Sequence, residues 1–110
     1  MQIKKKSQEL DKKTIFRMTE SDSTVKMSDA DGQVLEIAAW ILYDDVNGKG
    51  EQVEVLSILT TEGEIYATIS DTFKKKFSKM VDVFGSELDK IKIVSGTSKK
   101  GLGYISCDVV

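Results

Sequence analysis

The fold of this chain is decided by the stretch VLEIAAWILY at residues 34–43. Apolar side chains alternate with others along part of it, and such alternation predicts a β-strand. Successive side chains of a strand point to opposite faces, so one face can line a core. The face that we expect to line the core carries four aliphatic side chains, Leu35, Ile37, Ala39 and Ile41. Trp40 shares the other face with Glu36, and we therefore expect its indole to point toward solvent.

Two later segments repeat this placement of a large ring opposite an aliphatic face. The faces opposite Tyr66 and Tyr104 carry Ile65, Ala67 and Ile69 in one segment and Ile105, Cys107 and Val109 in the other. Flat rings on the solvent side of a sheet suit stacking against nucleobases. The pattern indicates Trp40, Tyr66 and Tyr104 as candidate stacking residues. For Trp40, partial burial under the N-terminal segment or under a helix is an equally weighted alternative.

Before this strand, residues 1–13 are polar and rich in lysine, and they are expected to form a flexible basic arm. A single domain is expected over residues 14–110. Alternation and β-branched content predict its strands at residues 14–19, 34–43, 51–61, 64–69, 90–94 and 102–109. The segment 20–32 is expected to be a long loop. Phe16 and Tyr43 fall on apolar faces and are expected in the core, and Cys107 is expected to be an inert core residue.

The hydrophobic period changes after residue 70. Large apolar side chains recur at spacings of three and four, at Phe73, Phe77, Met80, Val81 and Phe84. This spacing predicts a helix over residues 71–84, with Ser70 or Asp71 as its cap and Gly85 after its end. If the segment 51–69 is one strand bent at Glu62-Gly63, the helix falls between the third and fourth of five strands. That order is typical of the OB-fold. The expected fold class is therefore mainly β with one helix, an OB-fold-like five-stranded barrel.

Composition excludes several classes of function. The chain has no histidine and one cysteine, so a zinc site or a Cys/His or Ser/His catalytic pair cannot be assembled. Only carboxylate, Lys or Tyr chemistry remains open to an enzyme, and the carboxylates are scattered through expected loops without an obvious partner. We therefore expect no catalytic residue, no metal, no cofactor and no enzyme. No apolar run approaches the roughly 20 residues of a membrane helix, so no membrane partner is expected. The net charge of −2 counts against a duplex DNA clamp more than against a binder of single strands.

Lysines concentrate near the C-terminus, in and before the loop SGTSKKG at residues 95–101. The loop lacks the Lys-Ser/Thr pair of a P-loop. A mobile hairpin loop is the favoured interpretation. The alternative is that Lys92, Lys99 and Lys100 contact backbone phosphates. The run Lys74-Lys75-Lys76 is most simply a solvated helix face, with phosphate contact as the less favoured interpretation.

From about residue 37 to the C-terminus the chain resembles the single-stranded DNA-binding proteins of small, protein-primed tailed phages of Gram-positive bacteria. The resemblance is carried by IAAW at 37–40, GEIYATIS at 63–70 and IKIVSGTSKKG at 91–101. It implies a barrel-like binding fold. It also implies stacking roles at Trp40 and Tyr66, where that family carries tyrosines, and an aromatic at the position of Tyr104.

These observations together predict a non-enzymatic, sequence-independent single-stranded DNA-binding protein. It would coat displaced strands during replication or transfer of a phage or mobile element, in the cytoplasm of a bacterial host. Stacking by Trp40, Tyr66 and Tyr104 would combine with phosphate contacts from Lys92, Lys99 and Lys100. The alternative is an OB-fold interaction module that recruits a replication protein. The sequence does not determine the oligomeric state.

Overall fold

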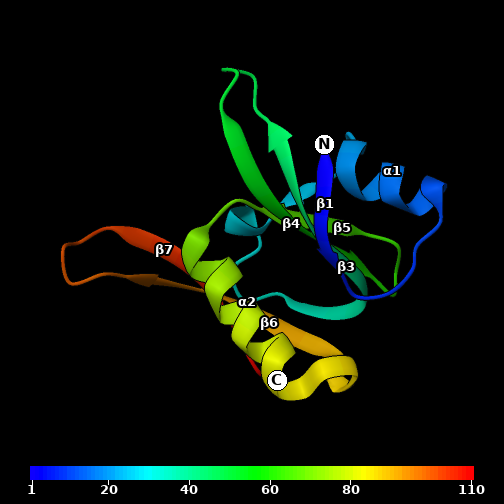
Figure 1. Cartoon of the computed structure of the whole chain (residues 1–110). Helices are drawn as coiled ribbons and strands as arrows, with labels where there is room; N and C mark the ends of the chain where they lie inside the picture. Colours follow the sequence, from blue (N-terminus) through cyan, green and yellow to red (C-terminus); the bar gives the residue numbers. More distant parts are fainter.

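A strongly curved β-sheet organises the whole chain, and the computed structural model describes residues 1–110 (Figure 1). Two α-helices are present, α1 at Lys12–Glu20 and α2 at Asp71–Phe84, with short 3-10 turns at Met27–Asp29 and Gly85–Glu87. The strands are β1 (Gln2–Lys6), β2 (Val25–Lys26), β3 (Val34–Val46), β4 (Gln52–Thr60), β5 (Ile65–Thr68), β6 (Lys90–Thr97) and β7 (Gly103–Asp108).

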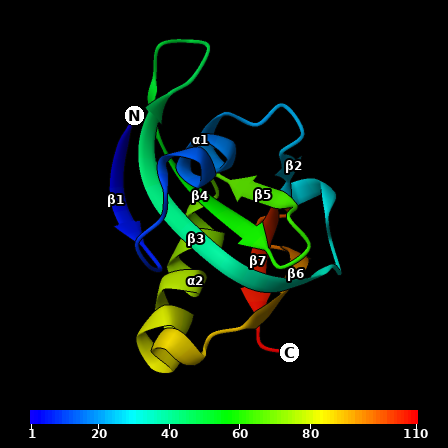
Figure 2. The same cartoon turned by 90° about the vertical axis from the view of Figure 1, so that its right-hand side faces the viewer.

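The sheet is curled but does not close. Six strands follow the order β2-β5-β4-β3-β6-β7, and β1 pairs with β3 outside this path. Only the β2–β5 pair is parallel. The long β3 pairs with β6 near its start and with β4 and β1 further along, so it carries the bend of the sheet (Figure 2). Because β2 and β7 remain unpaired to each other, the expected five-stranded barrel is wrong. The fold is a mixed α/β half-barrel, mostly strands with two helices.

Two cores lie on opposite faces of the sheet, and α2 covers the larger. That core contains Phe73, Phe77 and Met80 from α2 together with Leu35, Leu56, Ile58, Tyr66, Ile91, Ile93 and other buried residues. The smaller core, under α1, contains Met18, Ala39, Ile41, Tyr43 and Ile65. Strand β4 contributes Leu56 and Ile58 to one core and Val55 and Leu59 to the other. Strand β4 is therefore a central strand that is apolar on both faces.

A bulge in β3 changes which face each residue occupies. The register with β4 shifts between Ile37 and Ala39. An extra residue in a strand reverses the alternation beyond it. Leu35 accordingly lies in the core under α2, whereas Ala39 and Ile41 lie in the core under α1. The expectation that these side chains share one face is wrong, and Trp40 consequently points toward α2.

The N-terminal segments differ most from expectation. Residues 14–19 belong to helix α1 rather than to a strand, because Ile15 and Met18 also lie three residues apart and can face the sheet from a helix. The Asp11 side chain caps this helix by accepting the Thr14 N–H at 2.7 Å. Phe16 is 66% exposed, so its expected place in the core is wrong. Residues 1–13 contain β1 and the start of α1 where a loose arm was expected.

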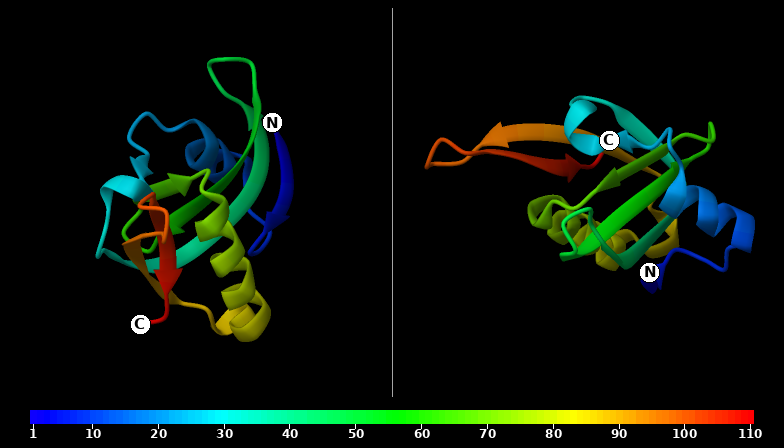
Figure 3. Two further views of the ribbon diagram at one scale, coloured as in Figure 1. Left: turned by 90° about the vertical axis from the view of Figure 1, so that its left-hand side faces the viewer. Right: turned by 90° about the horizontal axis from the view of Figure 1, so that it is seen from above.

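The C-terminal half follows the sequence closely. Helix α2 has the expected bounds, its Ser70 cap accepts the Phe73 N–H at 3.2 Å, and Gly85 ends it with a positive φ of 55°. Strands β6 and β7 form a hairpin that projects from the body of the molecule, seen at the left in the right-hand view of Figure 3. The segment 20–32, expected to be a loop, also contains β2 and a 3-10 turn.

Candidate nucleic-acid interface

Trp40 is held at its backbone and partly open at its ring. Its N–H donates to Ser7 Oγ at 3.0 Å, and its carbonyl accepts the Ser7 N–H at 2.9 Å. The indole meets the Phe77 ring of α2 in a T-shaped contact, with centroids 5.5 Å apart and planes at 84°. The side chain packs against the core without being fully buried. The ring is therefore partly buried under α2, and it also lines the hollows on the surface beside the helix.

A groove runs along both sides of this tryptophan, between α2 and strands β1 and β3. It consists of two hollows with volumes of about 250 Å³ and about 710 Å³, and Lys5, Trp40 and Val81 line both. Apolar side chains from β3, β4 and α2 form the floor of the smaller hollow, at Trp40, Leu42, Leu56, Phe77 and Val81. The rim of the smaller hollow carries three lysines, Lys5, Lys74 and Lys75, and three carboxylates, Glu54, Asp71 and Asp82. The apolar floor suits the flat apolar part of a ligand, and the lysines that form no ion pair can contact a charged backbone.

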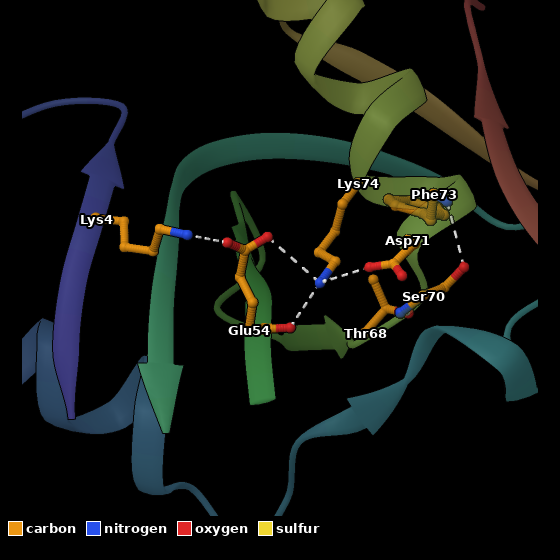
Figure 4. A network of polar contacts seen from close by, with 7 residues as sticks. All are labelled: Lys4, Glu54, Thr68, Ser70, Asp71, Phe73 and Lys74. Atoms are coloured by element: carbon orange, nitrogen blue, oxygen red, sulfur yellow. Dashed lines mark hydrogen bonds and ion pairs between the residues drawn. The ribbon is translucent and has the colours of Figure 1, made fainter. Parts of the chain in front are cut away.

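An ion network engages two lysines near the groove, Lys4 and Lys74, through Glu54 and Asp71 (Figure 4). Glu54 accepts from Lys4, and its Oε1 lies 3.4 Å from Lys74 Nζ. Lys74 also lies 3.3 Å from Asp71 Oδ1 and donates to the Glu54 carbonyl at 2.9 Å, so its side chain is only 10% exposed. The hydrogen bond from Lys4, with the nearby Lys74 charge, holds the pKa of Glu54 below its usual value.

Lys5 and Lys75 line the same groove and form no ion pair. The interpretation of residues 74–76 as a solvated helix face thus fails for Lys74, which is engaged with Glu54 and Asp71, and holds for the exposed Lys75 and Lys76. The sequence did not indicate Lys5 as a site residue, because residues 1–13 were expected to form a flexible arm without fixed neighbours. Its position next to Trp40 depends on the pairing of β1 with β3.

Tyr66 lies in the core instead of facing solvent. Its side chain is 8% exposed and packs in the cluster under α2, so the expected outward orientation is wrong. Burial raises the pKa of the phenol, and neighbouring Glu64 and Glu62 add to the rise. The hollow that Tyr66 lines also contains Glu36. Carboxylates at this position disfavour the approach of a phosphate.

Tyr104 is the second ring that solvent can reach, and it lies on the projecting hairpin. It is 42% exposed and pairs across the strands with Gly96. A Cβ at position 96 would lie 2.5 Å from the Tyr104 hydroxyl and 2.6 Å from its Cζ, so the ring lies against the β6 backbone where a side chain would otherwise stand. Because Gly96 has no side chain, the Tyr104 ring can occupy this position.

The predicted phosphate contacts all lie on or near the same hairpin. Lys99 and Lys100 are exposed in the turn between β6 and β7, and Lys92 is exposed opposite Asp108. None of the three forms an ion pair. Strand β6 pairs with the start of β3, but the turn of the hairpin projects away from β1, with α2 between them in the view of Figure 1. The structure therefore brings Tyr104 together with Lys99 and Lys100, and places Trp40 with Lys5 and Lys75 on the other side of α2.

No group of three or more His, Cys, Asp or Glu side chains is arranged so that it could hold a metal ion. Cys107 is buried as expected, its thiol donates to Met80 Sδ at 3.6 Å, and burial raises its pKa to about 12. No helix has both the length and the apolar character needed to cross a membrane.

A curved open sheet with grooves, accessible rings and free lysines is typical of proteins that bind an extended ligand along their surface. The model of the Phi29 phage single-stranded DNA-binding protein family matches residues 5–110. The chain belongs to this family. The match begins in β1, so it includes the N-terminal third, where the sequence alone showed no resemblance. No curated protein matches the chain, and no solved structure matches it.

Proposed function

We propose that this protein binds single-stranded DNA without sequence preference and coats displaced strands during replication or transfer of a phage or mobile element. It would act in the bacterial cytoplasm, as a binding protein and not as an enzyme. The observation that carries the proposal is the placement of Trp40. Its ring lies between two hollows with the free cations of Lys5 and Lys75 beside it.

Base stacking provides affinity that does not depend on sequence, because every base has a flat face. Each stacked base contributes about 1–3 kcal/mol. The T-shaped contact with Phe77 and the two backbone hydrogen bonds to Ser7 support the position of Trp40. A pre-positioned ring loses little conformational freedom when a base stacks on it. Lys5 and Lys75 would then contact the adjoining phosphates.

The β6–β7 hairpin supplies a second platform in this proposal. Tyr104 would stack on a base while Lys99 and Lys100 contact phosphates, with Lys92 nearer the base of the hairpin. Tyr66 stays a predicted stacking residue from the resemblance, but its ring would have to leave the core to meet a base. Its burial and its acidic surroundings favour a packing role.

Trp40 is the single tryptophan of the chain, so intrinsic fluorescence reports directly on the proposed site. Titration with oligo(dT) at low salt should quench this emission, and added salt should weaken the binding. Matched duplex should bind more weakly, and oligo(U) measures any preference between DNA and RNA. Emission that does not change with any oligonucleotide would contradict the proposal. Capture of a replication protein that survives nuclease treatment, without DNA binding, would favour the interaction-module alternative.

The variant Trp40→Phe keeps a ring, and Trp40→Ala removes it, so the pair isolates stacking. Binding of labelled oligo(dT), followed by anisotropy, should fall about tenfold or more for Trp40→Ala and much less for Trp40→Phe. Val83→Ala on the exposed surface of α2 is a suitable control for a change of apolar surface outside the groove. Equal affinity of Trp40→Ala and the wild type would remove Trp40 from the site.

A further inference from the structure

The N-terminal segment has a charge opposite to that of the whole chain. Residues 1–17 hold six of the sixteen basic side chains and two of the eighteen acidic ones. The six are Lys4, Lys5, Lys6, Lys12, Lys13 and Arg17. Ion pairs engage Lys4 and Lys6, and the other four form none. A concentration of free cations in an otherwise acidic protein indicates a local anionic ligand.

Helix α1 presents three of these cations and one aromatic ring on a single exposed face. Lys12, Lys13, Phe16 and Arg17 are all exposed, and the spacing of four residues places Lys12 beside Phe16 and Lys13 beside Arg17. The opposite face carries Met18, which is buried in the smaller core. Phe16 is 66% exposed although a core lies directly beneath the same helix. An exposed aromatic ring flanked by cations is the combination that binds single strands by stacking and charge.

The charges of α1 are also unfavourably placed for the free protein. Lys12 and Lys13 stand in the first turn, which contains no acidic residue. The helix dipole disfavours cations at this end, and only the Asp11 cap opposes them. A phosphate bound beside these lysines would offset their unfavourable interaction with the helix dipole.

The face of α1 is continuous with the Trp40 groove along the chain. Lys5, Lys6, Ser7 and Gln8 line the larger hollow beside Trp40. The chain then turns from β1 into α1 within a few residues (Figure 2). Helix α1 covers the face of the sheet opposite to α2, so a strand that leaves the groove past Lys6 reaches α1 by turning around the edge of the sheet at β1.

We propose that the exposed face of α1 is a third contact for the bound single strand. Phe16 stacks on a base, and Lys12 and Lys13 contact the phosphates beside it, with Arg17 at the edge of the face. This inference rests on the proposed function and adds a contact outside both platforms named above. Single-stranded DNA is favoured over a second copy of the chain, because each of its nucleotides supplies both a flat base for Phe16 and a phosphate for the lysines.

The test compares short and long oligonucleotides. Phe16→Ala and the double variant Lys12→Gln/Lys13→Gln are titrated with oligo(dT) of increasing length, with Trp40 fluorescence as the readout. Oligonucleotides just long enough to quench Trp40 should bind both variants like the wild type. Longer ones should bind Phe16→Ala about tenfold more weakly. The double variant should lower the slope of log affinity against log salt by about 1.4, from roughly 0.7 for each single-strand phosphate contact.

Controls separate this role from changes of fold and of total charge. Phe16→Tyr keeps the ring and should retain the affinity for long oligonucleotides. Lys26→Gln/Lys49→Gln removes the same charge elsewhere and should leave the length dependence unchanged. Phe16 is exposed, so its variants should melt at the wild-type temperature. Lys12→Gln/Lys13→Gln removes cations from the positive end of the helix dipole and should melt at the wild-type temperature or slightly above it. Quenching by short oligonucleotides with no loss at any length in either α1 variant would overturn this inference alone. An altered oligomeric state of Phe16→Ala with unchanged DNA affinity would also overturn it, in favour of a second copy. Absence of quenching at every length would overturn both this inference and the proposed function.

Discussion

Replacement of Gly96 by alanine tests the hairpin platform without removing an aromatic ring or a charge. The new Cβ would lie 2.5 Å from the Tyr104 hydroxyl, 2.6 Å from Cζ and 3.0 Å from Cε1. All three atoms belong to the outer part of a flexible side chain that is 42% exposed, so the ring would swing outward and the backbone would stay. Gly96→Ala therefore acts as a displacement of Tyr104.

The magnitudes separate binding from stability. Loss of the contact between Tyr104 and the Gly96 backbone costs about 0.2–1 kcal/mol, the range of a cross-strand pair. Alanine in a strand offsets this by about 0.5–1 kcal/mol relative to glycine, because the unfolded chain loses less freedom. The free energy of unfolding should thus change by less than about 1 kcal/mol. A displaced stacking ring should weaken DNA binding by about 1–3 kcal/mol, roughly a factor of 5 to 150 in Kd.

The assay is a double-mutant cycle on labelled oligo(dT), with thermal melting as the control. Gly96→Ala, Tyr104→Ala and the double variant should all lose a similar amount of affinity, because each removes the same ring from its place. Wild-type affinity in Gly96→Ala, beside a clear loss in Tyr104→Ala, would refute the idea that Gly96 positions the ring. Additive losses in the double variant would refute it as well.

Three further outcomes follow from the structure. Tyr66→Ala should lower the free energy of unfolding in urea by about 3–5 kcal/mol, because it leaves a cavity in place of a buried ring, and Tyr66→Phe should lower it much less. A free energy of unfolding for Tyr66→Ala equal to that of the wild type would place the ring at the surface. The pKa of Glu54 is lowered in the folded state, so the carboxylate stabilises the fold at neutral pH, and this stabilisation is lost as the pH falls from the ordinary pKa of 4.5 through the lowered pKa. The acid unfolding curve of Glu54→Gln should lack this component, and a curve identical to that of the wild type would show that the hydrogen bond from Lys4 does not form in solution. Cys107, with a pKa raised to about 12, should resist iodoacetamide at pH 8 in the native protein and react in denaturant; rapid native labelling would mean that the thiol is accessible.

Periodicity was informative where only one period fits. The spacing of Phe73, Phe77 and Met80 is incompatible with a strand, and α2 has the expected bounds. In residues 14–19 the apolar side chains satisfy both periods, and the presence of a neighbouring sheet face decides between them. Packing of Met18 into that face, with Ser57 Oγ donating to its carbonyl at 2.8 Å, supports the helix.

The positions of the candidate rings show the same limit. Tyr104 and the lysines of the β6–β7 hairpin lie as the sequence predicted, because a hairpin is a local structure. Trp40 and Tyr66 depend on distant segments. The bulge between Ile37 and Ala39 turns the indole toward α2, and the packing of β5 beneath α2 buries the phenol.

The amino-acid sequence by itself determined the strands from residue 34 onward, helix α2, the cation-rich hairpin and the kinship with phage single-strand binders. The tertiary structure alone decided that the sheet stays open, that β1 brings Lys5 beside Trp40, and that α1 exposes Phe16. The difference follows from the distance along the chain between the residues that interact. Local patterns record how a segment satisfies its own backbone and its own apolar face, whereas register shifts, strand partners and the covering of each sheet face depend on residues far away in the chain.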